Sequence, residues 1–171
     1  MLLSEKGVER LKEVAEFIRK DPDGFEMGDW LSKGENRPTH CNTVGCIAGW
    51  LVALNRPAAI RIAKSQGNYN PSFGPRIEDK ITNIPVVAHT LLGFSADTPY
   101  SVRETNSLFL PGDWPEKESR DGILECMEVT EYADPEDPKE RKAIKAARRK
   151  AAKLAGVRIK AFIKEYKPAS K

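Results

Sequence analysis

The chain has 171 residues, of which 40% are hydrophobic and 31% are charged. This balance is typical of a globular protein, and the length fits one compact domain, residues 1–171, with a core of its own. No apolar run approaches the ~20 residues of a membrane-spanning helix, and three cysteines are too few for a disulfide framework. We therefore expect a cytoplasmic protein in a reducing compartment, without a signal peptide or a membrane partner.

The first predicted element is an amphipathic helix that Ser4 can cap. Its apolar residues recur at spacings of three and four along the chain: Val8, Leu11, Ala15 and Ile18. Asp21–Gly24 ends this helix with strong turn chemistry. The apolar residues between Phe25 and Leu31 have the spacing of a second, short helix.

A central buried helix is predicted next, because the run from Val44 to Leu54 is apolar on every side. Asn42 or Thr43 is its expected N-cap. Glycine is unfavourable inside a helix by roughly 1 kcal/mol relative to alanine, so the two glycines at the start of this run indicate close packing or binding.

The middle of the chain predicts short helices separated by loops. Residues 57–63 follow a proline and form one candidate helix, and residues 66–76 form a loop rich in Gly, Pro and Asn that is the best candidate for a ligand-facing segment. A short hairpin within residues 66–82 is the minor alternative. Further helices are expected over 83–92, with Gly93 as C-cap, and from Thr98 to Leu110.

Charge is distributed unevenly over the chain. Residues 1–112 are neutral, residues 113–137 hold ten acidic and two basic residues for a net charge of −8, and residues 138–171 hold thirteen basic and two acidic residues for a net charge of +11. Residues 116–131 predict an acidic helix, and residues 138–166 predict a long basic C-terminal helix. The basic helix either binds nucleic acid or another polyanion, or is neutralised by the acidic segment folding back beside it. We favour the neutralised arrangement, although residues 113–137 also fit a flexible insertion.

No segment shows sustained alternation of apolar and polar residues. The predicted fold is therefore all-α, a compact helical bundle with a buried central helix and a long basic C-terminal helix.

One string in the central region resembles a known core motif. It reads C-x-T-V-x-C-I-A-G-W from Cys41 to Trp50, and weaker matches flank it in order: Phe25-x-Met27-x-x-Trp30, Leu91–Ser95, Leu108-Phe109 with Trp114-Pro115, and Arg158-Ile159-x-x-Phe162-Ile163. In this pattern the chain resembles an uncharacterised family of small bacterial and phage proteins. Asn42 stands where the family pattern has glycine, and residues 116–137 are an acidic insertion. The resemblance implies a small, helical, cytosolic protein encoded by a bacterium or a phage, and it implies no activity.

A cysteine-dependent hydrolase or transferase is one hypothesis for the chemistry. Cys41 lies just before the predicted central helix, whose N-terminus lowers a thiol pKa and favours the thiolate. The nucleophile needs a base, and His89 is the candidate, because the ring of His40 would point away from its sequence neighbour. The alternative is that Cys41 and Cys46 are inert small hydrophobic residues, and we favour this non-catalytic interpretation.

A metal site would use His40, Cys41, Cys46 and Cys126. The C-x4-C spacing departs from the usual C-x2-C arrangement of zinc sites. We therefore predict neither a metal nor a cofactor.

Our leading hypothesis is a non-catalytic binding or interaction protein. It recognises a small anionic, nucleotide-like ligand or a partner protein of the host, and the apolar central helix also permits a homodimer. Free N–H groups at a helix N-terminus bind anions, which places the predicted ligand site at the start of the central helix. The predicted ligand-binding residues are His40, Cys41, Asn42, Thr43, Trp50 and Arg76. A nucleic-acid binder using Arg148, Arg149, Lys150 and Lys153 is the second alternative.

Overall fold

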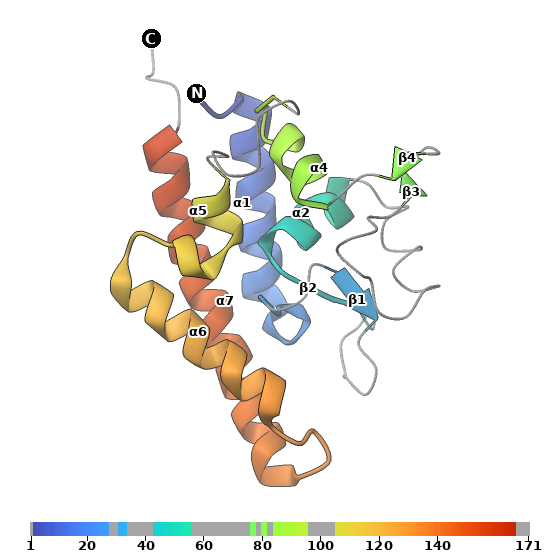
Figure 1. The fold of residues 1–171 in the computed structure, drawn as a ribbon, viewed down its shortest axis with the longest axis vertical. Helices are drawn as coiled ribbons and strands as arrows, with labels where there is room; N and C mark the ends of the chain where they lie inside the picture. The colour runs from blue at the N-terminus through green and yellow to red at the C-terminus, as the bar shows by residue number, and fades with distance from the viewer. Residues whose placement is uncertain are drawn as a thin grey trace.

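The structure is a computed structural model that describes residues 2–27, 31–33, 43–55, 76–77, 80–81, 84–95 and 105–166. Four short segments are described by their backbone alone: 31–33, 43–45, 76–77 and 80–81. Helices dominate the described residues, and two short antiparallel strand pairs accompany them (Figure 1). The predicted all-α class is confirmed.

Helix α1 (Glu5–Lys20) has the predicted cap and the predicted apolar face. The Oγ atom of Ser4 accepts a hydrogen bond from the Gly7 N–H at 2.9 Å, which satisfies one of the free donors of the first turn. The apolar face is buried in the core: Val8, Leu11, Val14 and Ile18. The 3-10 turn η1 (Pro22–Gly24) follows, and Phe25 and Met27 after it are buried.

The central helix is α2 (Ile47–Asn55), and every residue from Ile47 to Ala53 is buried, as predicted. Its start differs from the prediction, because Thr43–Gly45 form strand β2, which pairs antiparallel with β1 (Leu31–Lys33). Thr43 therefore does not cap the helix, and the short helix expected to reach Leu31 is also wrong. The β-branched Thr43 and Val44 favour an extended backbone, and they lie opposite Lys33 and Ser32 of β1.

The expected minor hairpin is present: β3 (Arg76–Ile77) pairs antiparallel with β4 (Lys80–Ile81). Helix α4 (Ile84–Leu91) follows and ends at Gly93, whose φ of +95° is the left-handed conformation of a glycine C-cap. A Cβ atom at Gly93 would lie 2.7 Å from the Cβ of Ser4, so this turn packs tightly on the start of α1.

After residue 95, the structure describes the chain again from residue 105 onward. Helix α5 (Asn106–Phe109) lies at the C-terminal end of the helix predicted from Thr98 to Leu110. The 3-10 turn η3 (Pro111–Asp113) follows it. Trp114 is buried and donates its indole N–H to the carbonyl of Leu108 at 3.2 Å. The predicted helix over 57–63 and the predicted loop over 66–75 lie outside the described residues.

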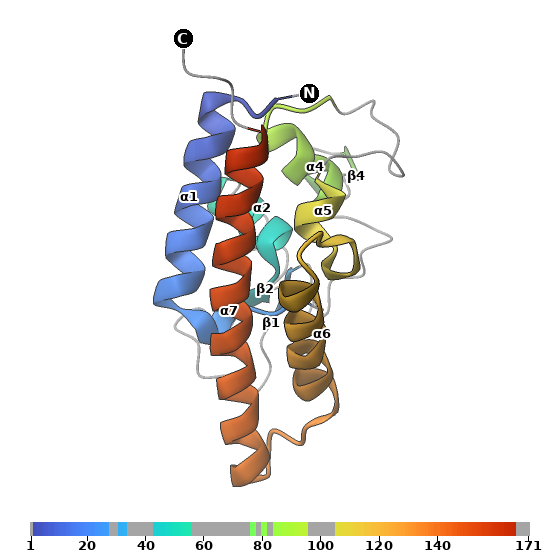
Figure 2. The same ribbon diagram turned by 90° about the vertical axis from the view of Figure 1, so that its left-hand side faces the viewer.

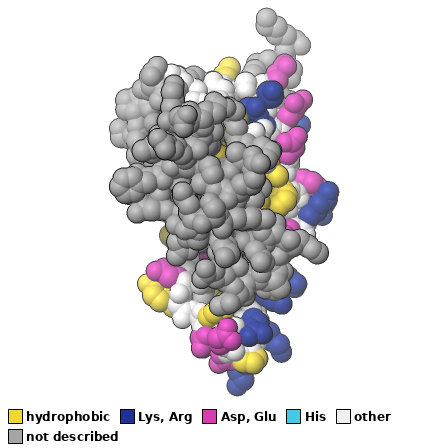
Figure 3. Space-filling model, turned by 90° about the vertical axis from the view of Figure 1, so that its right-hand side faces the viewer, with side chains coloured by type: hydrophobic (Ala, Val, Ile, Leu, Met, Phe, Trp, Pro, Cys, Tyr) yellow, Lys and Arg dark blue, Asp and Glu magenta, His cyan; other side chains and the backbone are white. Residues whose placement is uncertain are grey.

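Helices α6 (Lys117–Tyr132) and α7 (Pro138–Tyr166) form an antiparallel hairpin, with nearly the bounds that the sequence predicts (Figures 1 and 2). At 1.5 Å per residue, α7 is about 44 Å long. It contacts α6 along one side and α1 along another, and α1 also packs on α2. Figure 3 shows acidic and basic side chains next to each other at the end of the molecule that this hairpin forms.

The core lies between α1, α2, α4 and the upper part of α7, with Trp50, Trp114 and Phe162 among its largest buried side chains. Within the ranges described, no helix combines the length and the apolar character required to cross a bilayer.

Candidate functional site

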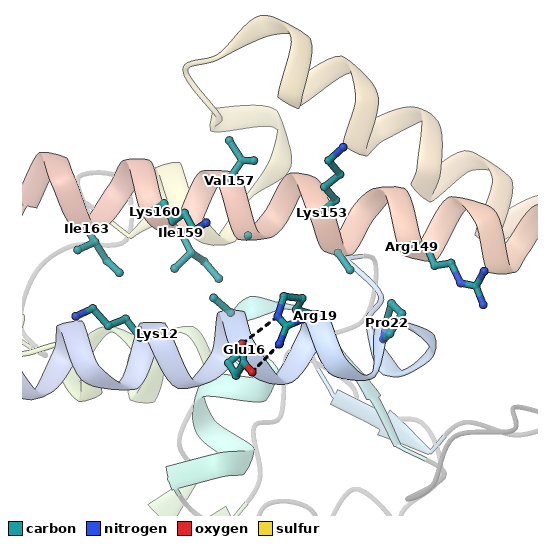
Figure 4. Close-up of a pocket in the computed structure, with 13 residues that line it drawn as sticks. Lys12, Glu16, Arg19, Pro22, Arg149, Lys153, Val157, Ile159, Lys160 and Ile163 are labelled. Carbon is teal, nitrogen blue, oxygen red and sulfur yellow. Dashed lines mark hydrogen bonds and ion pairs between the residues drawn. The ribbon is translucent and has the colours of Figure 1, made fainter.

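A groove of about 750 Å³ lies between α1 and α7. The two helices lie side by side and run antiparallel, so the groove follows both of their axes (Figures 2 and 4). It extends from Lys12 to Pro22 on one wall and from Arg149 to Ile163 on the other. At 1.5 Å per residue these walls are about 15 Å and about 21 Å long.

The floor of the groove is apolar and is built from small and branched side chains. Ala15 of α1 and Ala152 and Gly156 of α7 are short enough to leave a hollow between the helices. Ile159 and Ile163 reach from α7 toward α1 (Figure 4). Val157 is also among the lining residues and is 51% exposed, and its side chain lies on the side of α7 that points away from α1 (Figure 4).

The rim of the groove is cationic. Five basic residues line it, two from α1 and three from α7: Lys12, Arg19, Arg149, Lys153 and Lys160. Among the described residues, no ion pair is formed by Lys12, Arg149, Lys153 or Lys160. Four of the five rim cations therefore carry charges that no described residue neutralises by an ion pair.

Glu16 is the acidic residue of the groove, and it is already neutralised by its own helix. Its carboxylate accepts hydrogen bonds from Arg19 at 2.7 and 3.0 Å and lies 3.2 Å from Lys20 (Figure 4). The hydrogen bonds from Arg19 and then Lys20 lower the pKa of Glu16 to about 2. The groove consequently keeps a net positive rim at every pH at which the lysines are charged.

Trp50, which the sequence placed in a ligand pocket, lies in the core. Its side chain is 1% exposed, and its indole N–H donates to the carbonyl of Gly24 at 2.9 Å. Its ring centroid is 4.3 Å from that of Phe17 in a tilted arrangement. These contacts join α2 to the end of α1, which is a structural role.

The other predicted ligand residues are not brought together by the described structure. The backbone of Thr43 lies in β2 opposite Lys33, and that of Arg76 lies in β3 opposite Ile81. His40, Cys41 and Asn42 lie outside the described residues. The prediction of an anion site at a capped N-terminus of α2 is corrected at Thr43, because the helix begins four residues later, at Ile47.

His89, the proposed base of the cysteine-enzyme hypothesis, is fully buried on α4. Its Nδ1 atom lies 2.9 Å from the hydroxyl of Thr105, and its ring stacks on Phe94 with centroids 4.9 Å apart. The pairing of His89 with Cys41 stays a prediction, since Cys41 is not among the described residues.

The two described cysteines, Cys46 and Cys126, are buried and not joined in a disulfide. Burial raises the pKa of the Cys126 thiol, which keeps it protonated and unreactive. The described part of the chain contains no cluster of three or more His, Cys, Asp or Glu residues that could hold a metal ion.

Arg148, one of the four residues of the nucleic-acid hypothesis, does not lie on the surface of α7. Arg148 is 5% exposed and pairs with Glu26 at 3.2 Å, so it is a core residue and not part of a basic surface. Lys150 is exposed, but its ammonium lies 2.6 Å from the Glu125 carboxylate on α6. Arg149 and Lys153 instead line the α1–α7 groove.

Comparison with known proteins adds no assignment: no family model, curated protein or solved structure matches the chain. The resemblance to the bacterial and phage family stays a prediction.

The groove was not predicted from the sequence, although the basic character of α7 was. The available signal was that Arg149, Lys153, Lys160 and the small Ala152 and Gly156 fall on adjacent rows of one helix. Nothing in the sequence indicated that this face would lie beside Lys12 and Arg19, which precede it by 130 positions or more.

Proposed function

We propose that the protein is a non-catalytic interaction protein that binds an anionic, partly apolar partner in the groove between α1 and α7. The observation that carries this proposal is an apolar groove, lined in part by the 51% exposed Val157, together with a rim in which four cations have no ion-pair partner among the described residues. Exposed apolar surface rimmed by polar residues marks interaction sites.

Two features support recognition of a partner that carries both apolar groups and negative charge. An ion such as free phosphate would gain nothing from Ile163 or from Val157, which is 51% exposed. A neutral apolar ligand would gain nothing from Lys153 and Lys160. Burial of the apolar floor by the partner contributes binding affinity. The positive rim attracts the negatively charged partner and fixes its position in the groove.

The proposal can be tested with the fluorescent probe 8-anilinonaphthalene-1-sulfonate, which combines an aromatic body with one sulfonate. We expect saturable binding to the native protein, and at least about tenfold weaker binding to the double variant Lys153→Glu, Lys160→Glu, since each reversal removes one attraction and adds a repulsion. Lys142→Glu reverses an exposed charge of the same helix outside the groove and is the matched control.

Circular dichroism of each variant establishes that the fold is retained. Equal binding of the probe by the native protein and the double variant would place the binding surface elsewhere. Loss of binding in Lys142→Glu to the same extent would show that the net charge of the helix, and not the groove, governs binding.

A further inference from the structure

Gly156 is a helical glycine whose presence the described chain itself does not explain. Glycine inside a helix is unfavourable by roughly 1 kcal/mol relative to alanine, so it persists where a neighbour comes too close for a side chain. At Gly7, an added Cβ would lie 2.5 Å from the Leu92 carbonyl oxygen, and at Gly122 it would lie 3.1 Å from the Leu154 methyl carbon. An added Cβ at Gly156 meets no atom within 4 Å in the described chain.

The open space at Gly156 lies inside the groove. Gly156 is flanked on the same wall by Ala152 and Lys153 and by Val157 and Lys160, and Ala15 lies on the opposite wall. No side chain fills the groove at Gly156, and only methyl groups stand at Ala15 and Ala152. This is the point at which another backbone or a bulky apolar side chain can approach α7 most closely.

The shape of the groove matches a third helix. Its walls are two antiparallel helices, and the residues that line α7 recur at steps of three and four, which is the ridge pattern into which helices pack. Walls of about 15 and 21 Å correspond to three to four helical turns of 5.4 Å. An amphipathic helix that lies in such a groove presents its anchors at positions i, i+3 or i+4, and i+7.

The positive charges of the rim favour an acidic helix as the binding partner. Four of the five rim cations have no ion-pair partner among the described residues, and the remaining one, Arg19, neutralises Glu16. Acidic residues flanking the apolar stripe of a docked helix would meet cations from both walls, Lys12 on one side and Arg149, Lys153 and Lys160 on the other. Nucleic acid fits less well, because its phosphates would leave the apolar floor uncovered.

We infer that the α1–α7 groove binds an acidic amphipathic helix of three to four turns from a partner protein, with one apolar side chain of that helix seated over Gly156. This inference rests on the proposed function and names the partner class of the same groove. The docked helix completes a three-helix layer with α1 and α7.

The test uses a synthetic peptide of about 18 residues with leucines at i, i+4, i+7 and i+11 and glutamates beside them. A peptide of the same composition in scrambled order and a single-stranded oligonucleotide of similar charge are the comparison ligands. Affinity is measured by fluorescence anisotropy of the labelled ligands, at two salt concentrations.

We expect the amphipathic peptide to bind at least about tenfold more tightly than the scrambled peptide, because only the ordered stripe covers the floor. Gly156→Trp fills the groove and should weaken peptide binding by at least about tenfold. Ala146→Trp adds the same bulk at an exposed position of α7 outside the groove and should leave the affinity unchanged. Gly156→Ala, which adds one methyl group to open space, checks that a side chain at this position is compatible with folding.

The outcomes separate the inference from the proposed function. If the sulfonate probe binds in the groove but the amphipathic peptide binds no better than its scrambled form, the helix inference is overturned and the proposed function stands. Tighter groove-dependent binding of the oligonucleotide would also overturn the inference, in favour of nucleic acid. If neither the probe nor the peptide binds, both proposals fail.

Discussion

The two long sides of α7 carry similar charges and meet different surroundings. On the side of α6, Lys150 pairs with Glu125 at 2.6 Å, and Gly122 of α6 lies so close that a Cβ there would approach the Leu154 methyl carbon to 3.1 Å. On the side of α1, Lys153 and Lys160 border an open groove, and Gly156 faces empty space in the described chain. The acidic helix covers one side of the basic helix and leaves the other available.

The basic residues of α7 therefore have three different roles, and the neighbours of each residue decide which role it has. Arg148 and Arg158 are buried and hydrogen-bonded, Lys150 is neutralised on the surface, and the groove cations are open. The acidic segment does fold back beside the basic helix, as we favoured from the charge distribution, but it neutralises only part of it.

Substitution of a buried cation should have the largest effect on stability. The side chain of Arg158 is 1% exposed and donates to the Ser107 carbonyl at 2.7 Å and to the Glu116 carboxylate at 3.1 Å. We expect Arg158→Ala to lower the free energy of unfolding by about 3 kcal/mol, because these acceptors lose their donor. Urea denaturation measures this change.

Lys164→Ala, at an exposed position of the same helix, is the control and should stay within about 0.5 kcal/mol of the native protein. If both variants change stability equally, Arg158 belongs with the surface cations and the comparison breaks down.

Substitutions of Gly122 and Gly156 should change the free energy of unfolding by a smaller amount. Gly122→Leu forces extra volume into the α6–α7 contact and should lower the free energy of unfolding by about 1–2 kcal/mol. Gly156→Leu adds the same side chain to open space and gains helix propensity, so its stability should equal or exceed that of the native protein by up to about 1 kcal/mol. Thermal unfolding of both variants tests this, and equal destabilisation would show that the groove is closed.

The smallest effect concerns the acidic residue of the groove. Arg19 and Lys20 lower the pKa of Glu16 from 4.5 to about 2. The ion pairs of Glu16 with these two residues therefore stabilise the fold fully above about pH 4.5. This contribution is lost as the pH falls from there through about 2, because protonation removes the acceptor charge. Carbon-13 NMR titration of the Glu16 carboxyl should show a midpoint near 2, and Arg19→Gln should move it back toward 4.5. A native midpoint near 4.5 would mean that the pair is not formed in solution.

Much of the helical architecture could be predicted because its signals are local. The apolar spacing and Ser4 cap of α1, the Gly93 cap of α4 and the prolines around α6 and α7 define elements without reference to the rest of the chain. The start of α2 was missed because the pairing of Thr43–Gly45 with Leu31–Lys33 competes with helix formation. That competition is decided by a segment outside the local window.

Two residues predicted for a site, Trp50 and His89, are core residues for a similar reason. The indole of Trp50 and the ring of His89 have the chemistry of a binding site, yet packing buries both rings and engages them with Gly24 and Thr105. Aromatic and histidine side chains serve cores and sites alike, so residue type alone cannot separate the two roles.

By itself, the sequence determined the all-α class, the buried central helix and the opposite charges of α6 and α7, because periodicity, caps and charge are properties of neighbouring residues. The tertiary structure alone shows that the side of α7 toward α6 has an ion-paired lysine and that the side toward α1 borders a groove. This depends on α1 and α6 packing against different faces of α7. Burial of apolar faces brings α1 beside α7, although the two helices are more than 100 residues apart in the sequence.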